Sequence, residues 1–118
     1  MLVRTETTIA ASHYIRGHEG HCARSHGHNW KIVVWIEDPV LDELGRVWDF
    51  GNLKKITRRL DHCGRLVNDI IHRNATAENM AEWIAEEIIK TYKLPEMLRV
   101  RVWETEKNYA EVTKGVGR

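Results

Sequence analysis

One stretch organises the predicted fold: Cys22-Ala-Arg-Ser-His26-Gly-His28-Asn-Trp30-Lys-Ile-Val-Val-Trp-Ile36. It begins rich in histidine and becomes a run of β-branched and aromatic residues, which favours a strand. Alternate residues of an extended chain point to the same face, so His26 and His28 would present two imidazoles to one point. Imidazole nitrogen suits zinc. The stretch therefore predicts a metal site where a loop becomes a strand, with Cys22 at its mouth.

The totals describe a small globular chain with one compositional oddity. Its 118 residues fit a single domain, with 42% hydrophobic and 30% charged residues. A formal net charge of +1 gives no field that would attract nucleic acid or an acidic membrane. No apolar run reaches the ~18 residues of a membrane span, and no signal peptide opens the chain, so we expect a cytoplasmic protein. The oddity is the presence of seven histidines.

Two strands are expected around the histidine-rich segment. Residues Leu2 to Ala11 alternate β-branched with polar side chains, and Asn29 to Glu37 alternate in the same way. The Gly- and His-rich segment between them is long for a hairpin loop, and long ordered loops are often functional. An antiparallel pairing of the two strands would bring His13 beside His26 and His28.

The rest of the chain predicts two helices and two further strands. A helical pattern begins at Asp49, a plausible N-cap, and stops before Gly64. Thr76 is the expected N-cap of the second helix, which ends before Pro95. Strands are then expected over Leu98–Trp103 and Tyr109–Thr113. The order β-β-α-α-β-β indicates an α+β fold, in which a four-stranded antiparallel sheet carries two helices on one face.

Three histidines form the candidate metal site. With His13, His26 and His28 as ligands and no obvious fourth protein ligand, the site would keep an open position, as catalytic zinc sites do. The alternative is that these are separate surface or turn histidines. His18 and His21 are rival ligands, but they lie in mid-loop, where spacing constrains no geometry.

Cys22 is the candidate reactive thiol. A zinc ion nearby would lower the pKa of a thiol, so Cys22 could act as a base or a nucleophile. It could instead be a fourth zinc ligand, which would make the site closed and structural. A reducing compartment argues against a disulfide with Cys63, which we interpret as an ordinary packed thiol.

Two acidic motifs could complete a site. In Asp61-His62, a carboxylate could orient a histidine as in an acid–base relay. The spacing alone favours the simpler alternative, a histidine stabilised by the helix dipole beside a solvated acid. Glu104-Thr105 follows an expected strand. There a carboxylate could accept paired hydrogen bonds from the N–H and NH₂ edge of a pterin or guanine, or could be a plain turn acid.

Six short motifs occur in order across nearly the whole chain: Ala11-Ser12-His13, Cys22-x-x-x-His26-Gly27-His28-Asn29, Asp49-Phe50-x-x-Leu53-Lys54, Leu60-Asp61-His62, Thr76-Ala77-Glu78-Asn79 and Glu104-Thr105. Together they resemble the 6-pyruvoyltetrahydropterin synthase / 6-carboxytetrahydropterin synthase family. The resemblance implies the tunnelling fold (T-fold), whose subunits join their sheets into a β-barrel. It also implies a homo-oligomer with active sites at subunit interfaces, usually a homo-hexamer built as a dimer of trimers, or another homo-oligomer. Such assembly would close exposed sheet edges.

The resemblance also implies roles. The matching zinc ligands are His13, His26 and His28, and the substrate is 7,8-dihydroneopterin triphosphate. The matching catalytic residues are Cys22 as the proton-abstracting thiol and Asp61 and His62 as its relay partners. Glu104, with Thr105, matches the pterin anchor, and Glu104 is often counted in the catalytic relay as well.

The three-residue gap between Cys22 and His26 resembles the carboxy-forming branch of the family, which feeds 7-deazaguanine (queuosine or archaeosine) synthesis. The pyruvoyl-forming branch stays open as an alternative, as does a non-catalytic zinc-stabilised pterin-binding protein. The chain departs from the family pattern at Ala75, where proline is usual, and in its longer segment between His62 and Asn68.

Overall fold

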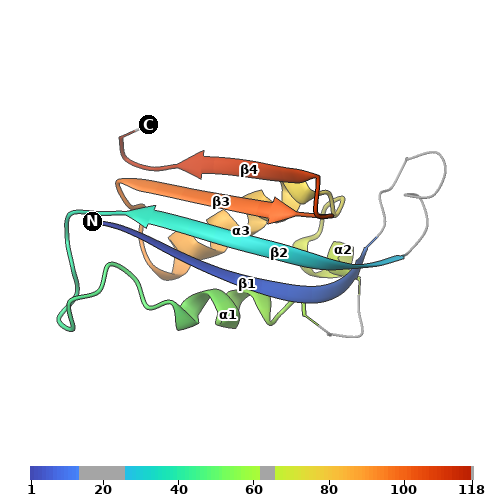
Figure 1. The fold of residues 1–118 in the computed structure, drawn as a ribbon, viewed down its shortest axis with the longest axis horizontal. Helices are drawn as coiled ribbons and strands as arrows, with labels where there is room; N and C mark the ends of the chain where they lie inside the picture. The colour runs from blue at the N-terminus through green and yellow to red at the C-terminus, as the bar shows by residue number, and fades with distance from the viewer. Residues whose placement is uncertain (14–25, 62–65, 118) are drawn as a thin grey trace.

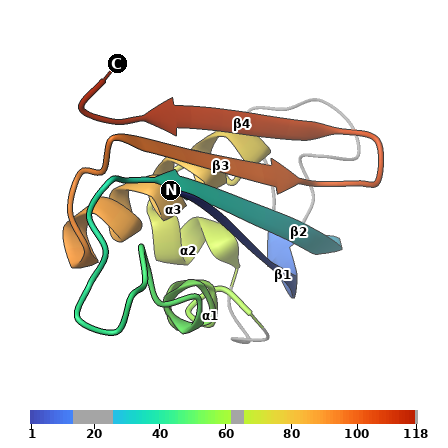
Figure 2. The ribbon, with the colours of Figure 1, turned by 60° about the vertical axis from the view of Figure 1, so that its left-hand side comes forward.

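The computed structural model describes residues 1–13, 26–61 and 66–117, with the backbone alone at residue 26. Four antiparallel strands form one sheet in the order β1-β2-β3-β4 (Figure 1). The strands are β1 (Leu2–His13), β2 (His26–Glu37), β3 (Met97–Trp103) and β4 (Tyr109–Lys114). Within the described residues, three helices cover one face of this sheet (Figure 2): α1 (Gly51–Thr57), α2 (Val67–Ile71) and α3 (Ala77–Thr91). The fold expected from the sequence is therefore confirmed, with one additional short helix.

The first two strands are longer than their alternation pattern indicated, and both extend toward the histidine-rich segment. β1 continues to His13, and β2 begins at His26. The two strands pair in unbroken register from Leu2 opposite Glu37 to His13 opposite His26. The pairing of the two strands thus brings His13 and His26, two histidines of the candidate site, to directly opposite positions.

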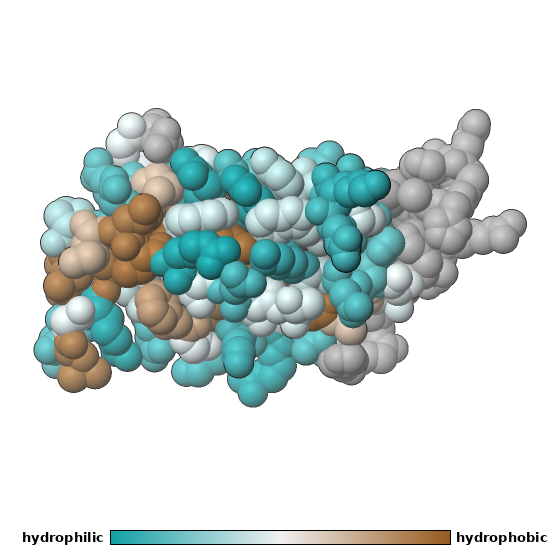
Figure 3. Space-filling view, viewed as in Figure 1, coloured by the Kyte–Doolittle hydropathy of each residue, from teal (hydrophilic) through white to brown (hydrophobic). Residues whose placement is uncertain are grey.

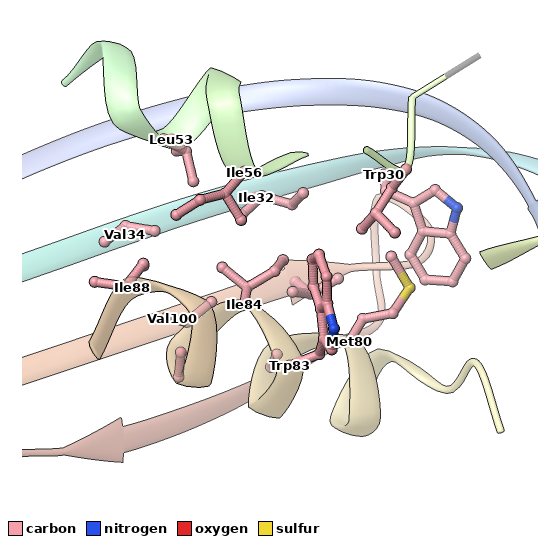
Figure 4. Close-up of a cluster of buried hydrophobic side chains, with 14 of the residues drawn as sticks. Trp30, Ile32, Val34, Leu53, Ile56, Met80, Trp83, Ile84, Ile88 and Val100 are labelled. Atoms are coloured by element: carbon pink, nitrogen blue, oxygen red, sulfur yellow. The ribbon is translucent and has the colours of Figure 1, made fainter. Parts of the chain in front are cut away.

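The core lies between the sheet and the helices. The alternation along β2 predicts that Trp30, Ile32, Val34 and Ile36 share one face, and all four are buried on the helix side of the strand. Figure 4 shows aliphatic side chains of α1 and α3 pointing at the strands: Leu53, Ile56, Ile84 and Ile88. Each such side chain stabilises the fold by about 1.5–3 kcal/mol through burial. Trp30 and Met80 extend this core toward the histidine end of the sheet (Figure 4).

The helix boundaries differ from the expected ones in three places. Asp49 is not the N-cap, which is Phe50; the Asp49 carboxylate instead accepts a hydrogen bond from the backbone N–H of Gly51, as in an Asx turn. α1 ends at Thr57 because the following N–H groups of Arg59 and Leu60 bond three residues back, which tightens the chain into turns.

The third difference is α2, an additional helix that lies between the two predicted ones. Its buried residues Val67 and Ile71 are four apart and so share one face of a helix. The predicted N-cap of α3 is confirmed, since Thr76 Oγ1 accepts a hydrogen bond from the N–H of Asn79 at 3.0 Å. No helix in the described segments is long and apolar enough to cross a bilayer.

Asp38 fastens the end of β2 to the end of α3. It is 4% exposed, its Oδ1 accepts from the Val40 N–H at 3.1 Å, and its Oδ2 lies 3.1 Å from Lys93 Nζ. Burial alone would raise the Asp38 pKa, but the hydrogen bonds from Val40 and Lys93 hold that pKa below its ordinary value. The ionised form is therefore favoured in the folded protein.

We expect Asp38→Asn to lower the free energy of unfolding at pH 7 by about 1–2 kcal/mol, because one hydrogen-bonded charge is lost. A depressed folded-state pKa stabilises the fold above the unfolded pKa, and this stabilisation disappears as pH falls through the folded pKa. The difference between variant and parent in urea denaturation should accordingly shrink toward acid pH. Glu43→Gln, at an exposed acid of the same loop, is the control and should unfold like the parent. An equal loss at every pH would contradict this account.

Candidate metal centre and active site

His13 is held rigidly at the end of β1. Its side chain is fully buried, and its Nδ1 lies 2.7 Å from the backbone carbonyl oxygen of Ala75. A carbonyl only accepts hydrogen bonds, so Nδ1 carries the proton and donates it. The lone pair then sits on Nε2. Metal-binding histidines are typically held in this way, with the second ring nitrogen donating to a carbonyl or carboxylate.

Three potential ligand atoms converge beside His13. Among the described residues, His13, His28 and Glu104 each place one ligand atom within 4.8 Å of the other two. Glu104 Oε1 lies 3.6 Å from His13 Nε2 and 3.3 Å from His28 Nε2. The side chains of His28 and Glu104 are 22% and 25% exposed, so the cluster is open on one side. This donor set of imidazole nitrogens and one carboxylate fits a divalent transition metal such as zinc.

Trp30 packs against both described histidines of the cluster. Its ring meets His13 edge-on at 4.7 Å between centroids and His28 at 5.4 Å. The indole N–H donates to the carbonyl oxygen of Ala11 at 3.3 Å, so the ring cannot turn freely. A fixed apolar wall limits the orientations of the two imidazoles and keeps water from that side.

The β3–β4 turn positions Glu104. The backbone N–H of Glu104 donates to the Asn108 carbonyl at 3.0 Å, which closes the turn. Thr105 Oγ1 accepts from the backbone N–H groups of Lys107 and Asn108 at 3.3 and 3.2 Å. Glu104 therefore reaches the histidines, whereas Thr105 holds the turn together.

Asp61 lies against β1 rather than in the histidine cluster. Its Oδ1 accepts from the backbone N–H of Ala10 at 2.9 Å, and Leu66 bridges to Ser12 in parallel register. Asp61 and Leu66, which flank residues 62–65, thus both lie beside the last part of β1. Asp61 also borders a hollow of about 590 Å³ between β1 and α1, which Lys54, Lys55 and Arg58 line as well.

Comparison with known proteins identifies the family of this chain and supports its fold. The model of the 6-pyruvoyl tetrahydropterin synthase family matches residues 2–115. The chain belongs to this family. It is 36% identical to a protein of Archaeoglobus fulgidus that is provisionally named 6-carboxy-5,6,7,8-tetrahydropterin synthase, over 97% of this chain and 96% of the relative. It is 31% identical to the 6-carboxy-5,6,7,8-tetrahydropterin synthase of Synechocystis, over 88% and 86% of the two chains.

Among solved structures, the 6-pyruvoyl tetrahydropterin synthase of Caenorhabditis elegans superposes with a TM-score of 0.73. That match covers 98% of this chain and 95% of the other at 24% identity, so it supports the fold. The four-stranded antiparallel sheet with helices on one face is thus the T-fold of the 6-pyruvoyl tetrahydropterin synthase family.

Within this family member, the structure brings together part of the predicted site. His13, His28 and Glu104 meet, and the backbone of His26 lies directly opposite His13. Several predictions fall outside the described residues and stay predictions: the thiols of Cys22 and Cys63, the side chain of His26, and the residues His18, His21 and His62.

Sequence reasoning missed two contributions to the site. The Ala75 carbonyl, which holds His13, carries no side-chain signal. In the sequence, Ala75 stands out only as a departure from the family pattern. Alternation along the strand places Trp30 on one face with Ile32 and Val34, but this pattern cannot show that the same ring contacts two histidines. Glu104 was expected at the substrate, and its distances to both histidines add metal binding as a role to test.

Proposed function

We propose that this protein is a zinc-dependent 6-carboxy-5,6,7,8-tetrahydropterin synthase. It would convert 7,8-dihydroneopterin triphosphate to 6-carboxytetrahydropterin, acetaldehyde and triphosphate, and so supply 7-deazaguanine synthesis. The observation that carries the proposal is the cluster of His13, His28 and Glu104 in a chain of this family. The names of the two relatives favour the carboxy-forming reaction.

We assign zinc binding to His13, His26 and His28. The imidazole donors fit this ion, and the Ala75 carbonyl leaves the Nε2 lone pair of His13 available. When bound, zinc supplies a Lewis acid that polarises oxygen atoms of the substrate side chain.

The chain's own residues would then handle protons and orientation. Cys22, as the thiolate, removes the proton from a side-chain carbon of the substrate, and Asp61 with His62 relays protons during turnover. Glu104 accepts hydrogen bonds from the N–H and NH₂ edge of the pterin ring. Its position 3.3 Å from His28 Nε2 would place that ring next to the metal.

We propose that the protein assembles as a homo-hexamer, a dimer of trimers, through its sheet edges. β1 and β4 are the two outer strands, and an unpaired edge readily adds another strand. Apolar side chains gather on the surface at the end of the sheet where the chain begins (Figure 3). Exposed large apolar residues include Met1, Leu2, Val40, Leu41 and Leu44. Such surface is typical of proteins that associate.

The deciding experiment is to incubate the zinc-loaded protein with 7,8-dihydroneopterin triphosphate and to resolve the products by mass spectrometry. Acetaldehyde with 6-carboxytetrahydropterin supports the proposal. A pyruvoyl product without acetaldehyde supports the alternative that this chain is a 6-pyruvoyltetrahydropterin synthase, the name of its family and of the nematode structure. Bound zinc and an intact oligomer without turnover would leave a zinc-stabilised pterin-binding protein.

Replacing Glu104 with glutamine separates its two conceivable roles. If Glu104 anchors the substrate, Glu104→Gln keeps the zinc content of the protein and lowers turnover by about a hundredfold. The amide keeps one acceptor oxygen but presents an NH₂ donor to the other N–H group of the pterin edge. Zinc content by atomic absorption and turnover by product formation are the measurements. Glu106→Gln, at an exposed acid of the same turn, is the matched control. If Glu104→Gln loses zinc while Glu106→Gln keeps it, Glu104 is a metal ligand instead.

A further inference from the structure

The N-terminus of α3 is built around the peptide that holds His13. The Ala75 carbonyl accepts the Nδ1 proton of His13 across 62 positions of sequence, at 2.7 Å. Ala75 itself is fully buried and immediately precedes Thr76, the N-cap of α3. The direction of one backbone carbonyl therefore determines the tautomer and the orientation of the His13 ring.

Asn79 fixes this peptide from both sides. Its side-chain Nδ2 donates to the carbonyl oxygen of Asn74, before Ala75, at 2.9 Å. Its backbone N–H donates to Oγ1 of Thr76, after Ala75, at 3.0 Å. The three residues Asn74, Ala75 and Thr76 are thereby bracketed by a single residue of the helix.

This arrangement differs from an ordinary capping box. In that motif the third helical residue is glutamate or glutamine, and its side chain accepts from the N–H of the N-cap residue. Asn79 occupies that third position but donates, and its acceptor lies two residues before the N-cap. A glutamate at this position would stabilise the helix equally well. The amide of Asn79 does something that a glutamate cannot: it donates a hydrogen bond that holds the Ala75 peptide.

We propose that Asn79 is a positioning residue for the metal centre, which acts by holding the Ala75 carbonyl in line with Nδ1 of His13. The inference rests on the proposed zinc site, because its consequence is measured at that site. Asn79 touches neither the metal nor the substrate in this role. Its effect is to keep Nδ1 protonated and Nε2 directed at the cluster with His28 and Glu104.

The test compares Asn79→Glu with the parent protein. Glutamate at this position completes a capping box with Thr76, so α3 should keep its stability, but it cannot donate to Asn74. We expect zinc affinity, measured by competition with a chromophoric chelator, to weaken by about tenfold to a hundredfold, as for other outer partners of metal ligands. The added negative charge would strengthen cation binding, so a weakening cannot come from charge.

A second readout does not need metal. In the metal-free protein, the ¹⁵N shifts of the His13 imidazole report which ring nitrogen carries the proton. The parent should show a single tautomer protonated at Nδ1, and Asn79→Glu should show a mixture. This measurement decides the proposal even if the parent binds no zinc, an outcome that would overturn only the proposed metal site.

Ile88→Val is the matched control on the same helix. Ile88 is buried in the core away from Ala75, and the lost methylene should lower the thermal unfolding midpoint without moving the zinc affinity or the His13 tautomer. Asn79→Glu with the zinc affinity and the tautomer of the parent would overturn the proposal, and would leave Asn79 as a helix-capping residue.

Discussion

Replacing Cys22 with alanine should abolish turnover while the zinc stays bound. In the proposed reaction the thiolate of Cys22 removes a carbon-bound proton, and general base catalysis contributes up to about ten thousandfold to a rate. Alanine offers no group for that step, whereas the imidazole ligands assigned to zinc are unchanged. We expect a loss of turnover of about a thousandfold or more, measured as product formation at saturating substrate, with zinc content equal to that of the parent.

The same variant tests the opposite role for this thiol. If Cys22 were a fourth zinc ligand, its removal would release zinc and weaken the oligomer, which analytical ultracentrifugation would detect. Cys63→Ala is the matched control, since it removes the second thiol of the chain and should leave both turnover and zinc unchanged. A Cys63→Ala variant as inactive as Cys22→Ala would mean that the catalytic thiol is wrongly assigned.

The fold was predictable because apolar and polar side chains alternate clearly along the strands, and because most element boundaries are marked by glycine, proline or a helix-capping residue. Trp30, Ile32, Val34 and Ile36 alternate with side chains of the other face, which predicts that they share one face, and all four are buried. The errors lie where local hydrogen bonds override periodicity. The predicted helix after Asp49 continued toward Gly64, but i→i+3 bonds from Arg59 and Leu60 ended it near Thr57.

The site was less predictable, because it is assembled by contacts between segments distant in sequence. The pairing of β1 with β2 explains why His13 and His28 come together, and strand alternation could foresee this. The carbonyl of Ala75 could not be foreseen, because every residue has one and only the position of the segment before α3, beside the end of β1, selects it. That Glu104 reaches both histidines is likewise visible only in the interatomic distances of the structure and not in the sequence.

His28→Asn should release the metal and with it the activity. His28 Nε2 points to the same place as His13 Nε2 and Glu104, and its side chain is 22% exposed, so asparagine can be accommodated at the strand end. An amide is a poor zinc ligand compared with imidazole. We expect zinc affinity to fall by more than about a hundredfold, beyond the range for outer partners of ligands, and turnover to fall with it.

The control for this prediction is His72→Asn. His72 is exposed after α2 and adopts a φ of 58°, a left-handed conformation that asparagine tolerates well. Both variants exchange histidine for asparagine, but only His28→Asn changes the cluster. We therefore expect His28→Asn to lose zinc and His72→Asn to keep it. Adding excess zinc discriminates further: activity recovered at high zinc means that His28 contributes affinity, while zinc bound without activity means that His28 also orients the substrate. Full zinc affinity in His28→Asn would contradict the assigned ligand set and move the metal toward residues outside the described segments.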